Sequence, residues 1–309
     1  MHIGKVELKN NLLLAPLAGY TDVGFRRLCL HYGAALAFTE MVSAKGLCYG
    51  SEASLRLLAV SDGESPSAAQ IFGGEPEFIY KACRLPCLEK FDIIDINMGC
   101  PVPKIVKNGE GSFLLKDNNL ITEITQAAVE GANGRPVTVK IRLGFDDGDF
   151  SAVENALAAR KGGASMVTVH ARTSSQMYAG QADWGKVKAV KQALDIPVAV
   201  NGDITDAASM KKALALSGAD AVMIGRGALG RPYIFSELMD KPFVFDVKTA
   251  ILQHIEDLRK IMSDRTVANN IKKHICFYAR NSASSRNVRL DVNAASDLSG
   301  IFAVIDRYF

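Results

Sequence analysis

The chain has 309 residues, of which 48% are hydrophobic and 22% charged, and its formal net charge is +3. This composition is ordinary for a globular protein, and no apolar run approaches the roughly 20 residues that a membrane-spanning helix requires. The length suits one α/β barrel of roughly 250 residues with a small appendage. The amino terminus lacks the apolar stretch of a signal peptide, so we expect a cytoplasmic protein.

Cysteine spacing gives no sign of a metal centre. The six cysteines have no Cys-x-x-Cys pair, so neither a zinc site nor a disulfide framework is indicated, and we expect no metal. Free thiols fit a reducing cytoplasm. The six are Cys29, Cys48, Cys83, Cys87, Cys100 and Cys276.

Short apolar runs that favour strands recur eight times through the first three quarters of the chain. Stretches with helical apolar spacing separate most of them, for example at 120–129, 152–160 and 184–194. Strands that alternate with helices indicate a parallel sheet, and eight such units predict a (β/α)8 TIM barrel. The runs lie at 12–15, 36–39, 68–71, 93–96, 137–141, 166–169, 198–200 and 221–224.

The pattern changes after Pro242. Residues 247–262 and 271–280 have the spacing of amphipathic helices, and no clear strand follows. We therefore expect two domains, a barrel over 1–242 and a small all-helical domain over 243–309. The second stretch has 10 Lys and Arg against 7 Asp and Glu, so it carries the whole positive excess of the chain.

Residues that could form a site, most of them polar, lie at the ends of seven of the eight expected strands. The carboxyl ends of barrel strands form the face that carries the active site, so these side chains should meet at one mouth. Each alone has an ordinary explanation, such as a buried ion pair or a turn, but seven at one face favour a site. In strand order they are Pro16, Leu17 and Ala18, then Gln70, Asn97, Lys140, His170 and Arg172, Asn201, Gly202 and Asp203, and Gly225 and Arg226.

The run from Gly225 to Gly230 matches the G-x-G-x-x-G pattern of dinucleotide-binding folds. That pattern belongs in a βαβ unit with further parallel strands, whereas this one follows the last expected strand. A better interpretation is the phosphate site of a barrel, formed by the loops after strands 7 and 8, with Arg226 adding charge.

A loop rich in Gly and Pro follows the fourth expected strand and presents one thiol. Gly99 and Pro101 flank Cys100 at the strand end. A free cysteine is often simply buried, but this position at the mouth favours a functional role.

Eight short segments at the expected strand ends form one recognisable set. They are A-P-L-A-G-Y-T-D at 15–22, T-E-M at 39–41, Q-I-F-G at 70–73, N-M-G-C-P at 97–101, K-I-R-L-G at 140–144, V-H-A-R-T at 169–173, N-G-D-I at 201–204 and G-R-G-A-L-G-R-P at 225–232. Together they resemble the tRNA-dihydrouridine synthase family, nearest to its bacterial B type (DusB). The Asn-x-Gly-Cys-Pro loop is the most specific element, and Lys272-Lys273-His274 followed by Tyr278 resembles the helical domain of the family.

The resemblance implies that FMN is reduced by NADPH and passes a hydride to C6 of a tRNA uracil, while Cys100 protonates C5. A thiol of ordinary pKa, about 8.5, is protonated at neutral pH and suits a general acid. Pro16, Leu17 and Ala18 would line the isoalloxazine, Gln70 would hydrogen-bond it and Lys140 would stabilise its reduced form. The ribityl phosphate would be held by His170, Asn201, Gly202, Asp203, Gly225 and Arg226. The uracil would contact Asn97, Arg172 and Tyr178. The helical domain, with Lys272 and Lys273, would bind the RNA.

Two other functions remain open from the sequence. One is a dihydroorotate-dehydrogenase-like flavoprotein that acts on a free pyrimidine, although such an enzyme would not need the basic helical tail. The other is an RNA-binding protein with an inactive barrel, against which intact Cys100 and Lys140 argue. We expect a monomer.

Overall fold

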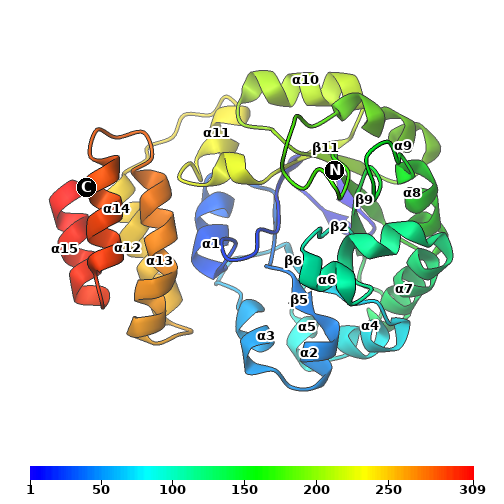
Figure 1. Ribbon diagram of the computed structural model, residues 1–309, viewed down its shortest axis with the longest axis horizontal. Coiled ribbons are helices and arrows are strands. Elements are labelled where there is room, and N and C mark those ends of the chain that lie inside the picture. Colours follow the sequence, from blue (N-terminus) through cyan, green and yellow to red (C-terminus); the bar gives the residue numbers. More distant parts are fainter.

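The computed structural model describes residues 1–309, and its main feature is a closed barrel of parallel strands (Figure 1). Neighbouring strands follow the order β4-β3-β11-β10-β9-β8-β7-β6, and a β4–β6 pairing closes the ring. The short β5 (Val42–Ser43) adds to β6. The barrel strands are β3 (Leu12–Leu14), β4 (Leu36–Phe38), β6 (Ser67–Phe72), β7 (Ile93–Asn97), β8 (Val137–Arg142), β9 (Met166–His170), β10 (Val198–Asn201) and β11 (Ala221–Ile224).

Helices surround the barrel and pack on the outward side chains of its strands, such as Ile94, Val167 and Val200. Several begin at a side-chain cap, for example α1 at Asp22 and α7 at Asp117. The helices are α1 (Val23–His31), α2 (Ala44–Cys48), α3 (Glu52–Leu57), α4 (Pro76–Cys83), α5 (Pro86–Glu89), α6 (Pro103–Lys107), α7 (Asn118–Gly131), α8 (Ala152–Lys161), α9 (Val187–Ala193), α10 (Ala207–Ser217) and α11 (Ile234–Leu238), with 3-10 turns η1 (Gly111–Lys116), η2 (Trp184–Lys186) and η3 (Arg226–Ala228).

The barrel interior is apolar toward the amino ends of the strands. Leu13, Phe38, Ile93 and Met166 belong to one buried cluster, to which Ile3 also contributes. Ile3 comes from the hairpin of β1 (His2–Ile3) and β2 (Val6–Glu7). Its turn residue Gly4 lies against Pro136 and Ser165, which precede β8 and β9, so the hairpin covers the amino end of the barrel.

Side chains alternate between the two faces of a strand, so a residue two positions after an inward apolar residue also points inward. Gln70, Asp95 and Thr138 are register partners on β6, β7 and β8, and Asn97 pairs with Lys140 one step further on. The inward positions thus change from apolar to polar toward the carboxyl ends.

A helical unit follows the barrel and lies beside it, at the left of Figure 1. Its side chains form a buried cluster of their own, which includes Ile251, Ile271, Val288 and Ile301. The barrel adds Val23 of α1, the helix against which the unit packs. The helices are α12 (Val247–Arg259), α13 (Asp264–Tyr278), α14 (Ser285–Ala294) and α15 (Leu298–Tyr308).

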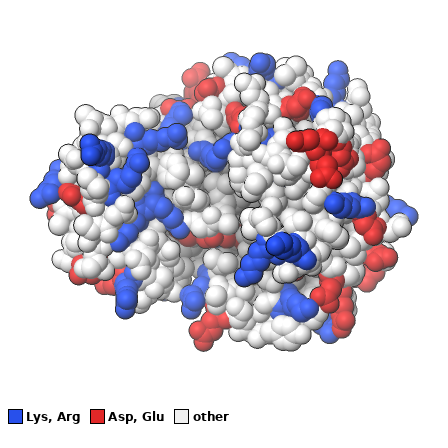
Figure 2. Space-filling view, in the orientation of Figure 1, with Lys and Arg blue, Asp and Glu red and all other residues white.

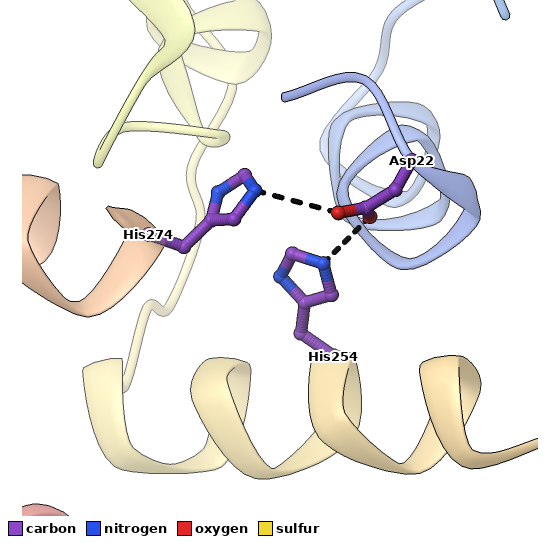
Figure 3. Close-up of side chains that lie close together, drawn as sticks. All are labelled: Asp22, His254 and His274. Carbon is purple, nitrogen blue, oxygen red and sulfur yellow. Dashed lines mark hydrogen bonds and ion pairs between the residues drawn. The ribbon is translucent and has the colours of Figure 1, made fainter. Parts of the chain in front are cut away.

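Three polar side chains join the two units (Figure 3). Asp22 caps α1, and its Oδ1 lies 2.7 Å from Nε2 of His254 on α12, while its Oδ2 lies 3.5 Å from Nε2 of His274 on α13. Around a tetrahedral metal with bonds of about 2.0–2.2 Å, adjacent ligand atoms stand roughly 3.3–3.5 Å apart. The 2.7 Å contact is a hydrogen bond, so we interpret the trio as a polar clasp between the units.

The predicted (β/α)8 barrel with a helical carboxyl-terminal region is confirmed, and each of the eight predicted runs overlaps one barrel strand. The helix predicted at 271–280 in fact begins at Asp264, and α14 and α15 were not predicted. No helix has both the length and the apolar character needed to cross a membrane.

Candidate active site

A chain of hydrogen bonds crosses the polar layer of the barrel. Asp95 accepts from Nε2 of Gln70 at 2.7 Å, and Oε1 of Gln70 accepts from Nδ2 of Asn97 at 2.9 Å. Oδ1 of Asn97 in turn accepts from the backbone N–H of Gly99 at 3.1 Å and of Cys100 at 2.9 Å. The strand-end amides therefore hold the loop that presents the thiol.

Cys100 lies beside this layer and is 9% exposed. Burial raises the pKa of its thiol, which a backbone hydrogen bond from Val102 and the charges of Arg142 and Lys140 oppose only in part. The side chain is therefore a neutral thiol at neutral pH, as a proton donor must be.

Lys140 stands at the carboxyl end of β8, and none of the ion pairs of the chain includes it. Burial, together with the charge of Arg142, lowers the pKa of its ammonium to about 7, although Asp95 and Cys100 raise it. Burial raises the pKa of Asp95 to about 6, against hydrogen bonds from Gln70 and Thr138 and the charge of Lys140. Opposite charges thus lie on the neighbouring strands β7 and β8, with Asp95 fully buried and Lys140 partly buried.

The loops after β9, β10 and β11 form the second half of the mouth. Nδ2 of Asn201 donates to the carbonyl of Met223, and Gly202 has a φ of +117°, which favours glycine. A Cβ on Gly202 would lie 3.0 Å from Cδ2 of His170, so a larger residue would fill the space beside that ring. Burial, then the charges of nearby Lys and Arg, holds the pKa of His170 well below its ordinary value, so its ring is neutral.

Asp203 organises two arginines of this half. Its carboxylate accepts from Arg172 at 2.6 Å and lies 3.1 Å from Nη2 of Arg226, whose side chain is 54% exposed. The donors Asn201 and Arg226 and the small Gly202 and Gly225 suit an anionic group, and Lys140 and Gln70 suit the polar edge of a flavin ring. The residues at the mouth therefore fit a flavin that carries an anionic group.

Arg172 is further from solvent than the sequence suggested. It is 1% exposed and donates to the carbonyls of Ala179 and Gly180 as well as to Asp203, so it holds the loop after β9 in place. Tyr178 on that loop is 54% exposed, and its ring lies 5.4 Å from Cζ of Arg226.

Arg142 was missed by sequence reasoning. It lies two positions after Lys140 on β8, so the period of two could have identified it as an inward residue. It donates to the carbonyls of Gly99 and Thr173, and its guanidinium lies 5.6 Å from the ring of Tyr178. Arg142 therefore joins the Cys100 loop to the Tyr178 loop across the mouth.

The two predicted RNA-binding lysines point to different places. Nζ of Lys272 donates to the carbonyl of Ala295 at 2.6 Å, which closes the end of α14. Nζ of Lys273 lies 5.4 Å from the ring of Tyr20, on the loop that follows Pro16, Leu17 and Ala18. Lys273 is therefore the one of the two that borders the mouth.

Positive side chains gather on the helical unit where it faces the hollow between the two units (Figure 2). Arg280, Arg286 and Arg289 of this unit are exposed. A smaller basic group lies on the barrel side of the same hollow, where Lys104 and Lys107 of α6 are exposed.

Fold and mouth define a barrel enzyme whose active site lies at the carboxyl ends of its strands. The model of the family "Dihydrouridine synthase (Dus)" matches residues 13–306, which includes the helical unit. The chain therefore belongs to the dihydrouridine synthase family.

Curated relatives align along almost the whole chain. A probable tRNA-dihydrouridine synthase of Rickettsia conorii is 38% identical and covers 99% of this chain and 96% of the relative. A tRNA-dihydrouridine synthase B of Pasteurella multocida is 37% identical, with 100% and 96% covered. These matches agree with the B-type resemblance noted in the sequence.

Solved structures confirm the fold. A 2-naphthoyl-CoA reductase superposes with a TM-score of 0.61 at 12% identity, over 78% of this chain and 51% of that one. Morphinone reductase superposes with a TM-score of 0.55 at 14% identity, over 81% and 91%. At such identities the likeness concerns the fold alone.

Proposed function

We propose that this protein reduces a uridine of tRNA to 5,6-dihydrouridine, with FMN as its cofactor and NADPH as the source of electrons. The observation that carries the proposal is the buried thiol of Cys100 beside Lys140 and Asn97 at the mouth of a Dus-family barrel. NADPH and one proton are consumed for each C5–C6 double bond, and NADP⁺ is released.

FMN, when bound, would supply the hydride that reaches C6 of the uracil. Lys140 and Gln70 would contact its ring, with Pro16, Leu17 and Ala18 along one side, and Lys140 would stabilise the negative charge of the reduced state. His170, Asn201, Gly202, Asp203, Gly225 and Arg226 would hold its phosphate end.

Cys100 would donate the proton that C5 requires. Its thiol is protonated at neutral pH, and the amide of Asn97 holds the backbone of the loop that presents it. The resulting thiolate would be reprotonated from water. Asn97, Arg172 and Tyr178 would orient the uracil, and Arg142 would act with them because it lies between Cys100 and Tyr178.

The substrate base would have to leave its stack to reach this mouth, as enzymes that act on bases generally require. The basic residues of the helical unit, Lys273 among them, would bind the phosphates of the surrounding RNA. We propose residues 243–309 as the RNA-binding domain and 1–242 as the catalytic domain.

The visible spectrum of the purified protein tests cofactor, donor and acceptor together. We expect a flavin spectrum that extracts as FMN, bleaches with NADPH without oxygen and returns on addition of unmodified tRNA, with dihydrouridine found by mass spectrometry. tRNA that already carries dihydrouridine is the control. Protein without flavin, or flavin that tRNA does not reoxidise, would refute the proposal.

The alternative of a free-pyrimidine dehydrogenase predicts reoxidation by a small pyrimidine such as orotate. The Dus match extends through the helical unit to residue 306, which favours tRNA. An RNA-binding protein with an inactive barrel would carry no reducible flavin.

A further inference from the structure

The buried carboxylate of Asp95 has no assigned role in the proposed reaction. It lies below the mouth, 0% exposed, at an inward position of β7 between register partners Gln70 and Thr138. A charged carboxylate in such a position is costly unless it is paired and hydrogen-bonded. Its partners show what it does.

We propose that Asp95 is a positioning residue of the active site: it fixes the amides of Gln70 and Asn97 in one orientation, and so places Cys100, and it balances the charge of Lys140. This inference rests on the proposed function for its consequence in catalysis, and on the hydrogen bonds and charges of the chain for its physical basis.

The first part follows from donor and acceptor chemistry. An ionised carboxylate only accepts hydrogen bonds, so Gln70 must turn its NH₂ toward Asp95, as it does at 2.7 Å. The carbonyl of Gln70 then faces Asn97 and requires the NH₂ of that side chain, at 2.9 Å. Asn97 is left with its carbonyl toward the backbone N–H of Cys100, at 2.9 Å.

Replacing the carboxylate by an amide would remove this constraint. An asparagine at position 95 could offer either oxygen or nitrogen to Gln70, because the hydroxyl of Thr138 can accept as well as donate. Both orientations of Gln70 would then be satisfied, and with the reverse one the NH₂ of Asn97 would face the N–H of Cys100. The thiol would lose its single position.

The second part follows from the charges around Lys140. Lys140 shares the inward side of the barrel with Asp95, two residues before its register partner Asn97 on β7, and with Arg142, whose register partner is His170 of β9. The charges that act on its ammonium are those of Asp95, Arg142 and Cys100, and Lys140 in turn acts on His170. Asp95 is the only carboxylate among them, and Arg142 opposes protonation. Without Asp95, Lys140 would lose its proton at lower pH and, with it, the ability to stabilise negative charge.

Two near-isosteric variants separate these effects from general destabilisation. Asp95→Asn removes the carboxyl group and the fixed orientation, whereas Thr138→Val removes one hydrogen bond to the same carboxylate, at 2.5 Å, but keeps the carboxyl group. Each variant is prepared with FMN, and its activity is expressed per bound flavin, so loss of cofactor does not count as loss of catalysis.

We expect Asp95→Asn to lower kcat for tRNA by about tenfold or more with little change in KM, as displaced reacting groups do. Titration of the Lys140 ammonium by nitrogen NMR, with Lys140→Met as the assignment control, should move to lower pH in Asp95→Asn and move by less in Thr138→Val, which keeps the carboxyl group. The basic limb of the pH profile should move with it.

The inference would be overturned if the titration of Lys140 did not move in Asp95→Asn, or if this variant had the wild-type kcat per bound FMN. It would also be overturned if the titration of Lys140 moved equally far in Thr138→Val. If the wild-type protein made no dihydrouridine, the proposed function would fail, and the NMR titration would still decide whether Asp95 governs Lys140.

Discussion

His254 approaches α1 so closely that a Cβ on Gly24 would lie 2.2 Å from its Cδ2 atom. The absence of a side chain at Gly24 is what lets the imidazole reach Asp22, one of the contacts between barrel and helical unit. Gly to Ala within a helix ordinarily stabilises by about 1 kcal/mol. Here we expect Gly24→Ala to destabilise the protein by about 1–3 kcal/mol, as overpacking does.

Urea unfolding measures this effect, and a double-mutant cycle with His254→Ala is the control. With the imidazole removed, the added methyl should no longer destabilise. A Gly24→Ala variant that is more stable than the wild type would contradict the geometry of this contact.

Acidification should lower the stability that the contact between the barrel and the helical unit contributes. Burial, and then the charge of His254, lowers the pKa of His274 to about 4, whereas an unfolded histidine titrates near about 6.5. Between these values the unfolded chain binds a proton that the folded chain does not, so stability falls as the pH drops, by up to about 3 kcal/mol from His274 alone. Unfolding free energies at about pH 7.5 and pH 5 should differ less in His274→Gln.

His170 contributes in the same direction, because its pKa is also lowered, but it is intact in both proteins. The difference between their pH dependences therefore isolates His274. Identical pH dependences would show that His274 does not titrate as its burial requires.

Removal of the thiol should separate the two halves of the catalytic cycle. We expect Cys100→Ala to retain FMN and its reduction by NADPH, but to form dihydrouridine about 10²-fold more slowly, as after loss of a general acid. Rapid-mixing absorbance measures both steps. Cys276→Ala is the control, because this half-buried thiol belongs to the helical unit. Equal loss in both half-reactions would make Cys100 structural.

Arg226 provides the test of the phosphate end. Its exposed guanidinium lies 3.1 Å from Asp203 and is free to turn to an anion. We expect Arg226→Ala to weaken FMN binding by about 1.5–3 kcal/mol, the range of a charge-assisted hydrogen bond. Fluorescence titration of the flavin-free protein with FMN measures this. Arg231→Ala is the control because Arg231 pairs with Glu237, and equal weakening there would remove Arg226 from the site.

Lys272 and Lys273 should behave differently although they are neighbours. Lys273 borders the mouth, so Lys273→Ala should weaken tRNA binding and lower the log–log salt slope by about 0.7–0.9 for one lost phosphate contact. Lys272→Ala should mainly lower stability, because its ammonium holds the carbonyl of Ala295. Filter binding across salt concentrations distinguishes them. If neither variant changed the slope, the RNA would be gripped elsewhere, and Lys104 and Lys107 would be tested next.

The barrel could be predicted from the sequence because each strand is a short apolar run that ends in polar residues, a local signal. The same local signal predicted which residues reach the mouth. It did not reveal Asp95, which stands inside an apolar run, because its partners Gln70 and Thr138 lie 25 and 43 residues away. Contacts of that kind are set by strand register, which one sequence does not display.

The contact between the barrel and the helical unit could not be predicted from the sequence for the same reason. Asp22 and His254 are 232 residues apart, and each alone looks like an ordinary helix cap or buried histidine. Arg172 illustrates the opposite limit, since a polar residue at a strand end can turn back to hold its own loop. Its proposed contact with the uracil stays a prediction.

The hairpin of β1 and β2 has a consequence for the order of events at the mouth. Because Ile3 packs into the apolar cluster at the amino ends of the strands, that end of the barrel offers no second entrance to the flavin. A nicotinamide and a flipped uracil would both have to approach one flavin from the carboxyl face. The two would therefore bind one after the other, and the oxidised nicotinamide donor would have to leave before the RNA binds. A high concentration of the donor would then compete with the RNA for the mouth and slow the reaction.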